Sequence, residues 1–281
     1  EDLEGHQQGL SDAWLEAIAP QESEKLERRF AWSGLDRQAL RRVLDQVVQP
    51  QELFCSENWF QELALLQAAL RSDAERQLQP YVAEVSEANP DQLPFSDLWL
   101  PAVDVFVDRL RSSLVDLQHR SIDDRVYLSL GRSLLTRLSK ISEQVLFEQF
   151  NLQRPPGAML LAHLGSDGDG EGPPVREYYE RFIREQRRDG LATLLETFPV
   201  LGRYLGQVCG DWHRANEMLL RRVDSDTLPL QQLFGVEPEM VLSEVRQGLS
   251  DPHNHGQVVS VLLFAEADGS SSEQVVYKPK D

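Results

Sequence analysis

Cysteine is scarce in this sequence, where Cys55 and Cys209 are the only two among 281 residues. Two cysteines exclude a disulfide framework and a cysteine-rich zinc cluster, and they suit a reducing compartment. We expect both side chains to be buried as small apolar groups. Long apolar segments are also missing, because none approaches the ~20 residues that a membrane span requires. Near Glu1 no basic head precedes an apolar stretch, as a secretory signal would require. Together these absences predict a cytoplasmic protein with no membrane span.

Basic residues are fewer than acidic residues in this sequence. The sequence has 28 Lys and Arg against 46 Asp and Glu, which gives a formal net charge of −18. Such a field repels phosphate backbones, and the arginine-rich stretches are interspersed with acidic residues, which is typical of solvated helix faces. We therefore expect no nucleic-acid partner. A basic peptide would be attracted by the long-range field.

Apolar residues recur at helical spacing through most of the chain. Pro101 is expected in the first turn of one helix, and Pro199 is expected to end one helix and begin another. Asp123 or Asp124 can accept hydrogen bonds from the free amides at a helix start. The expected buried stripes are Leu40, Val43, Leu44 and Val47; Trp59, Leu63, Leu66 and Leu70; Val103, Phe106, Val107, Leu110, Leu114 and Leu117; Leu134, Leu135, Leu138, Ile141, Val145 and Phe147; Val175, Tyr179, Phe182 and Ile183; Leu191, Leu194, Leu195 and Phe198; and Leu201, Tyr204, Leu205, Val208 and Trp212.

The helical pattern stops between residues 154 and 174, where glycine, aspartate and proline are frequent. A segment so poor in buriable side chains predicts a mobile loop. Asp167, Asp169 and Glu171 resemble the start of a calcium-binding EF-hand loop. The twelfth position is Tyr178, however, where such a loop needs a bidentate glutamate, so calcium is disfavoured.

The end of the sequence has the pattern of β-structure. Residues 258–264 predict a strand covered on both faces, residues 268–269 a turn, and residues 275–277 a returning strand. The predicted fold class is α+β, predominantly α-helical, with a helical body followed by a β-hairpin. Because a hairpin alone is marginally stable in water, we expect that Asp281 is not the natural end of the chain.

Chemistry-bearing side chains gather in one turn near the carboxyl end of the sequence, and three interpretations of it are open. Asp251, His253 and His255 alternate and could ligate a metal, although such ligands usually come from separated segments. Alternatively, Pro252 and Gly256 shape a loop whose amides hold phosphate, with Asp251 and His253 as acid–base groups. The third is a plain turn in which Asp251 accepts hydrogen bonds from its own backbone.

One lysine, Lys278, follows the last apolar strand. It is either an edge-strand charge that opposes aggregation or a point charge directed at phosphate. Lys280, which comes after Pro279, is expected to be solvated. The remaining histidines, His6, His119, His163 and His213, are expected to be surface residues or hydrogen-bonded core residues.

These residues resemble a known family. The strings Gly248-Leu249-Ser250-Asp251-Pro252-His253 with Gly256 and Val258, and Val276-Tyr277-Lys278-Pro279, are similar to motifs in the dehydratase domain of the class II lanthipeptide synthetases, the LanM-type enzymes. Upstream landmarks occur in the expected order: Phe198-Pro199-Val200-Leu201-Gly202-Arg203, Trp212, Glu217, Arg221-Arg222, Asp224 and Phe234. The resemblance covers roughly residues 94–281.

The resemblance implies an enzyme that uses ATP and Mg²⁺ to phosphorylate serine and threonine of a leader-bearing ribosomal precursor peptide. Elimination of the phosphate would then leave dehydroamino acids, before lanthionine formation. The implied fold is a helical body followed by the first β-hairpin of a lipid-kinase-like N-lobe. By the same resemblance, Asp251, His253 and Lys278 would be catalytic, and Lys278, Gly256 and His255 would contact the nucleotide.

The resemblance also predicts a division into an N-terminal helical region (1–93), the helical body of the dehydratase (94–247) and the start of the nucleotide-binding lobe (248–281). Gln257 stands where the family often has an arginine, which removes one potential phosphate ligand. The other catalytic residues, the metal-binding aspartate and the zinc-binding cyclase domain of such a synthetase would follow Asp281. We therefore expect no Zn²⁺ in this chain, and the remainder of the kinase-like domain as its partner.

Two other functions stay open. One is a non-catalytic helical module for peptide or protein interaction, in which the hairpin has no chemical role. The other is a lipid-kinase-like small-molecule kinase, which would phosphorylate its substrate without elimination.

We expect the 281-residue chain on its own to be inactive, because most of the implied catalytic residues would lie outside it. Incubation with ATP, Mg²⁺ and a cognate precursor peptide should leave the peptide mass unchanged in mass spectrometry. Detectable phosphorylation or dehydration by this chain would contradict the expectation.

Overall fold

The computed structural model describes residues 28, 30–31, 58–72, 93–117, 122–153, 175–248, 250–266 and 268–279. The expected helix at 40–47, the loop at 154–174 with its calcium-like start, Cys55, His6, His119, His163 and Lys280 lie outside these residues. The chain divides into two compact units, residues 1–57 and 58–281. The fold described below is that of the second unit.

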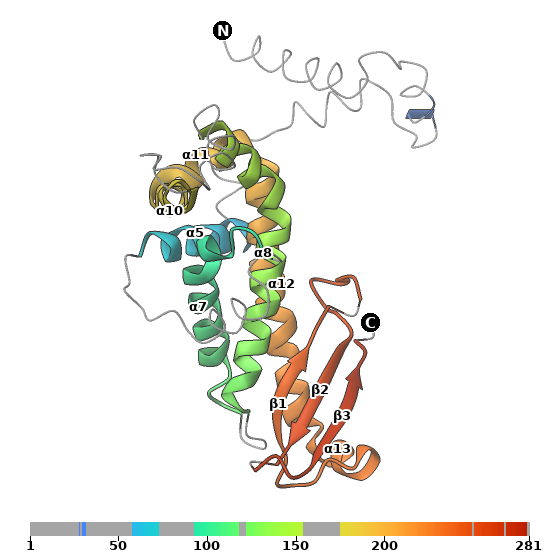
Figure 1. Ribbon diagram of the computed structural model, residues 1–281. Helices are drawn as coiled ribbons and strands as arrows, with labels where there is room; N and C mark the ends of the chain where they lie inside the picture. Colours follow the sequence, from blue (N-terminus) through green and yellow to red (C-terminus); the bar gives the residue numbers. More distant parts are fainter. Residues whose placement is uncertain are drawn as a thin grey trace. The chain divides into compact units, whose positions relative to one another are not determined.

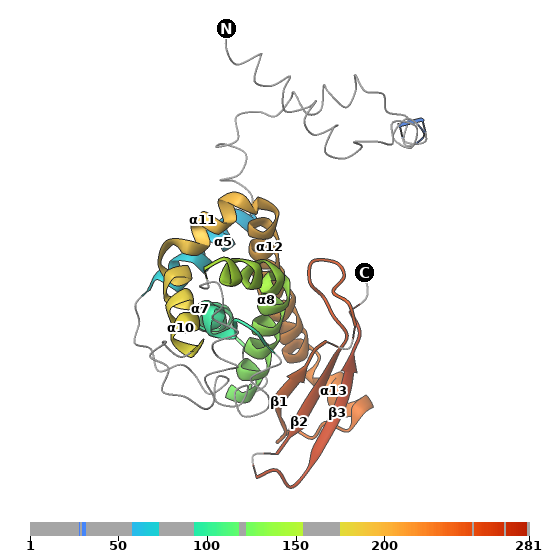
Figure 2. The ribbon, with the colours of Figure 1, turned by 45° about the horizontal axis from the view of Figure 1, so that its top comes forward.

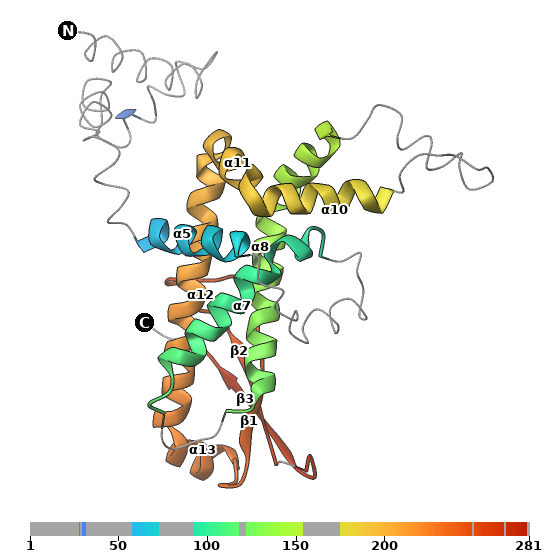
Figure 3. The ribbon, with the colours of Figure 1, turned by 90° about the vertical axis from the view of Figure 1, so that its left-hand side faces the viewer.

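Two long helices form the body of this unit, and the other helices pack around them (Figure 1). Helices α8 and α12 lie side by side, α5 crosses α12, and α7 packs on α8 (Figure 3). The bounds of the helices are α5 (Asn58–Arg71), α7 (Ser96–Ser113), α8 (Asp124–Gln153), α10 (Val175–Glu185), a π-helical turn η3 (Gln186–Gly190), α11 (Leu191–Thr197), α12 (Pro199–Ser225) and α13 (Thr227–Phe234). None of the helices built from the described residues is both long and apolar enough to cross a membrane.

The core of the body is built on two fully buried tryptophans. The indole N–H of Trp99 donates to the hydroxyl of Ser142 at 3.1 Å, and that of Trp212 donates to the carbonyl of Leu130 at 3.1 Å. A buried indole needs such a partner because an unpaired N–H in the core is costly. Cys209 is buried beside them in the same core, as expected.

Most of the expected apolar stripes are buried, but Ile141 (36% exposed), Phe147 (53%) and Tyr204 (55%) are not. On α8 the buried stripe continues instead through the positions of Ser142 and Leu146. Ser142 occupies a core position because its hydroxyl accepts the Trp99 hydrogen bond. A search for apolar residues alone therefore placed the stripe on the wrong side of the last turns of α8.

The helix boundaries follow the expected signals at two of three places. The carboxylate of Asp123 accepts the backbone N–H of Arg125 at 2.8 Å and thereby caps α8. Pro199 is the first residue of α12, directly after α11. Pro101, in contrast, lies inside α7 and not in its first turn, because α7 already begins at Ser96.

The strands form one antiparallel sheet of order β1-β2-β3, with bounds β1 (Val241–Arg246), β2 (Ser260–Ala265) and β3 (Ser272–Tyr277). The predicted hairpin is confirmed, with Ser260 paired to Tyr277 at one end and Ala265 to Ser272 at the other. The sheet lies to one side of the helices, with β1 nearest α8 (Figure 2). The fold class is therefore α+β with helices predominant, as predicted.

Strand β1 was not expected, because the sequence analysis continued the helical body to residue 247. A β-bulge between Leu242 and Glu244 disturbs the alternation of buried and exposed residues that would have revealed it.

The predicted boundaries at 93/94 and 247/248 also differ from the observed packing. Helix α5 packs on α7 and α12, and β1 belongs to the sheet.

One face of β2 is covered less than expected. Leu262 and Phe264 are buried on the helix side, whereas Val261 and Leu263 on the other side are half-buried. Val276, which pairs with Val261, is 56% exposed. In the described part of the chain, the sheet is covered by helices on one face only.

The crossing of α5 over α12 depends on Gly206. A Cβ atom at this position would lie 2.1 Å from the carbonyl oxygen of Trp59. We expect Gly206→Ala to lower the free energy of unfolding by roughly 1–3 kcal/mol, because the helices must separate to admit the methyl group. Chemical denaturation followed by circular dichroism would measure the loss.

Gly202→Ala is the matched control on the same helix. Its Cβ would meet Leu63 at an ordinary 3.4 Å, and alanine favours a helix over glycine by about 1 kcal/mol. Gly202→Ala should therefore leave stability unchanged or raise it. Equal effects of the two substitutions would show that the close approach at Gly206 does not matter.

Candidate functional site

The turn that carries Asp251, His253 and His255 is tightly held by its own backbone. His253 and Gln257 exchange two backbone hydrogen bonds, of 2.9 and 2.8 Å. Between them, Asn254, His255 and Gly256 all have positive φ angles, of 36°, 58° and 86°. Such a run is rare for residues other than glycine and costs on the order of 1 kcal/mol per residue. The two hydrogen bonds close the turn, and the side chains of Asp251, His253 and His255 are exposed on it.

The turn rests directly on α12. A Cβ atom at Gly256 would lie 2.8 Å from Cβ of Asp211, and 3.0 Å from its carbonyl oxygen. Nδ1 of His255 lies 3.9 Å from Oδ1 of Asp211, whose carboxylate also accepts a hydrogen bond from Arg214 at 2.6 Å. Glycine at position 256 is thus required both by the φ angle and by the close contact.

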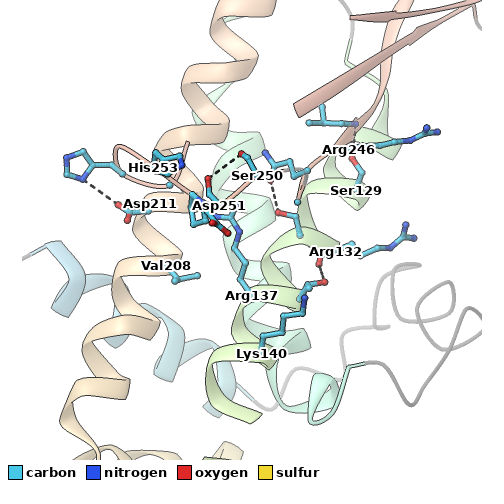
Figure 4. A pocket seen from close by; sticks show the side chains of 18 of the residues that line it. Ser129, Arg132, Arg137, Lys140, Val208, Asp211, Arg246, Ser250, Asp251 and His253 are labelled. Carbon is cyan, nitrogen blue, oxygen red and sulfur yellow. Dashed lines mark hydrogen bonds and ion pairs between the residues drawn. The ribbon is translucent and has the colours of Figure 1, made fainter. Parts of the chain in front are cut away.

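A cleft of about 740 Å³ opens between this turn, α8, α12 and the end of β1 (Figure 4). Four of the predicted site residues line it, namely Asp251, His253, His255 and Gly256. The cleft is therefore bounded by the turn that the sequence analysis singled out.

Lys278 does not line this cleft. Its side chain is exposed, one residue beyond the end of β3. Because Tyr277 pairs with Ser260 at the start of β2, Lys278 lies at the same end of the sheet as the turn. Lys278 and the turn thus share one end of the sheet, but Lys278 is not among the residues that line the cleft. That they contact one nucleotide stays a prediction.

The last strand is fastened to α12 through Tyr277. Arg222 donates a hydrogen bond to the Tyr277 hydroxyl at 2.5 Å, and its guanidinium carbon lies 6.0 Å from the centre of the ring. This contact holds the residue that precedes Lys278. The choice between an edge-strand charge and a phosphate ligand for Lys278 stays a prediction.

The opposite wall of the cleft is a polar stripe of α8 that the sequence analysis missed. Its members recur every three or four residues and thus share one face of the helix: Ser129, Arg132, Ser133, Thr136, Arg137 and Lys140. The spacing of polar residues was a usable signal, but the sequence was searched for apolar periodicity. Arg137 extends from α8 toward Asp251, whereas Arg132 and Arg246 point away from the turn (Figure 4).

Arg137 stands out among these cations. It is half-buried, and no hydrogen bond or ion pair joins it to any residue that the structure describes. Burial lowers the pKa of its guanidinium below the usual value, and the negative charge of Asp211 opposes this shift. Lys140, three residues later and exposed, likewise has no partner within the described ranges.

The end of β1 is fixed to both long helices by Gln247. The Ser133 hydroxyl donates to its amide oxygen at 2.7 Å, and its amide nitrogen donates to Asn216 at 2.7 Å. One turn earlier on α8, the hydroxyl of Ser129 accepts the backbone N–H of Val245 at 3.1 Å. These bonds hold three walls of the cleft in one arrangement.

The metal interpretation of the turn gains no support from the geometry. Within the described ranges, no three His, Cys, Asp or Glu side chains come together as metal ligands. Asp251, His253 and His255 share one turn, but they are not arranged around a common point.

His213 is a core residue that is only partly satisfied. Its Nε2 lies 3.7 Å from Oε2 of Glu217, while its buried Nδ1 has no hydrogen-bond partner among the described residues. Burial lowers the pKa of His213, and the charge of Arg109 lowers it further. It lies outside the cleft and in the core, as one of the two expectations had it, but the hydrogen bond expected for a core histidine is not found among the described residues.

Comparison with known families finds one match. Residues 198–281 match a domain of unknown function, DUF4135, which is associated with lanthipeptide synthetase-like proteins. The match covers α12, α13, the sheet and the turn, whereas α8 lies outside it. No curated protein matches the chain significantly.

Two of the glycines with positive φ, Gly256 and Gly269, allow a test of the contact with α12. Gly269 has a φ of 74° with nothing within 4 Å of a Cβ atom, so Gly269→Ala should cost only the conformational strain, about 1–2 kcal/mol. Gly256→Ala adds the clash with Asp211 and should cost roughly 1–3 kcal/mol more. Denaturant unfolding of both variants would compare them, and equal losses would mean that the turn does not press on α12.

Proposed function

We propose that this chain supplies part of the phosphate-handling site of an ATP-dependent peptide dehydratase of the lanthipeptide synthetase type. The enzyme would phosphorylate serine and threonine of a leader-bearing precursor peptide and then eliminate the phosphate. The observation that carries the proposal is the hydrogen-bonded turn of Asp251, His253 and Gly256 on a cleft whose opposite wall is cationic. The DUF4135 match over residues 198–281 supports it.

Both chemical steps require groups of the kind that the cleft offers. Phosphoryl transfer depends on positioning and on neutralising the negative charge of the phosphates. In the elimination, a base removes the α-proton, a double bond forms between the α and β carbons, and the bond from the β carbon to the phosphate oxygen breaks. Asp251 and His253 are the proposed acid–base groups, since carboxylates and imidazoles are side chains that commonly transfer protons in catalysis.

ATP and Mg²⁺ are the cofactors that the proposal requires. Bound ATP would supply the phosphoryl group, and Gly256, His255 and Lys278 are the residues proposed to contact its phosphates. The cationic wall suits such an anion, in a chain whose net charge is −18. The described residues offer no cluster of carboxylates for Mg²⁺, so the proposal assigns no magnesium ligand to them.

The proposal is tested in the protein that contains this chain, with a leader-bearing precursor peptide, ATP and Mg²⁺. Each dehydrated residue lowers the peptide mass by ~18 Da, and each retained phosphate raises it by ~80 Da. Lys278→Ala and Asp251→Asn should abolish dehydration. Glu273→Gln, at an exposed position of the strand β3 that precedes Lys278, should leave it intact.

The outcomes separate the candidate functions. Accumulation of phosphopeptide in His253→Gln would assign His253 to the elimination step. Unimpaired dehydration in Lys278→Ala would remove Lys278 from the site. Phosphorylation without any loss of water in the unaltered protein would favour a kinase without lyase activity, and no mass change at all would favour the interaction module.

A further inference from the structure

The cleft contains a pair of cations that the fold itself does not use. Two of its other charged residues are already paired, since Arg246 lies 2.9 Å from Glu244 and Asp211 lies 2.6 Å from Arg214. Arg137 and Lys140 have no such partner among the described residues. They are three residues apart on α8, so their side chains project from the same face of the helix.

An arginine that is half-buried and unpaired, as Arg137 is among the described residues, destabilises the fold. Withdrawing a guanidinium from water costs free energy unless an anion or hydrogen-bond acceptors compensate it. The charge of Asp211 compensates Arg137 only in part, because the Asp211 carboxylate makes its hydrogen bond to Arg214 and not to Arg137. A ligand anion in the cleft would supply the missing partner.

The chemistry of the pair indicates which anion. The guanidinium of Arg137 presents parallel N–H groups that match two oxygens of a phosphate, and the Lys140 ammonium adds a mobile point charge. The turn residues Asp251 and His253 line the same cleft as Arg137 and Lys140. A dianionic phosphate group fits this arrangement better than a single carboxylate, because two cations remain to be neutralised.

We infer that Arg137 and Lys140 form a phosphate-binding subsite on α8, which holds a phosphate ester against the turn of Asp251 and His253. This inference rests on the proposed function, and it places part of the site on a helix outside the matched domain. The phosphate can belong to the nucleotide or to a phosphoserine of the peptide, and the two sources require separate measurements.

Binding to the 281-residue chain tests the subsite without any need for catalysis. Isothermal titration at low ionic strength would use inorganic phosphate, ATP, a phosphoserine peptide and its unphosphorylated counterpart. Arg137→Gln and Lys140→Gln should each weaken phosphate binding about tenfold, as expected for loss of a charge-assisted hydrogen bond. Arg137→Lys should retain part of the affinity. Arg203→Gln removes the same charge from an exposed position of α12 outside the cleft, and it should bind as the unaltered chain does.

The two sources give different patterns. Weakening confined to the phosphoserine peptide assigns the subsite to the peptide intermediate, and weakening confined to ATP assigns it to the nucleotide. Affinities unchanged in both Gln variants, or lowered equally by Arg203→Gln, would overturn the inference. Circular dichroism would verify that each variant is folded. If Arg137→Gln unfolds, the phosphate affinity of Lys140→Gln tests the subsite, because Lys140 is exposed.

Different outcomes would refute the phosphate-binding subsite and the proposed dehydratase function. Peptide dehydration with unchanged phosphate affinity in the variants would refute the subsite alone. Phosphate binding through Arg137 without peptide modification by the complete protein would refute the dehydratase and keep the subsite.

Discussion

One side-chain amide joins the sheet to both long helices, and the geometry of the cleft depends on it. Gln247 accepts a hydrogen bond from Ser133 of α8 and donates one to Asn216 of α12, which is itself buried and bonded to the carbonyl of Trp212. An amide can satisfy both neighbours because it carries a donor and an acceptor side by side. Since the turn begins a few residues later, this bridge determines where the turn starts relative to the helices.

Two parts of the chain line the cleft, and only one of them matches a known domain family. The turn, the sheet and α12 fall within the DUF4135 match, whereas the cationic wall of α8 precedes it. The acid–base candidates Asp251 and His253 and the cations Arg137 and Lys140 therefore come from opposite sides of that boundary. Any chemistry performed in the cleft is a property of the two parts together.

Much of the fold could be predicted because burial imposes a period on the sequence. The stripes of α5, α7 and α12, the Asp123 cap and the hairpin all follow from spacing and turn chemistry. The failures occurred where a polar residue occupies a core position, as at Ser142, or where a bulge breaks alternation, as in β1. The turn was found by composition, but the stripe around Arg137 was not, since its partners across the cleft are more than a hundred residues away in sequence.

Helix α12 holds both ends of the proposed site. Asp211 supports the turn at Gly256, and Arg222 holds β3 through Tyr277. The two anchors are eleven residues apart on one uninterrupted helix, a rise of about 16 Å. Because one helix supports both contacts, its length sets the spacing between the turn and the strand that precedes Lys278.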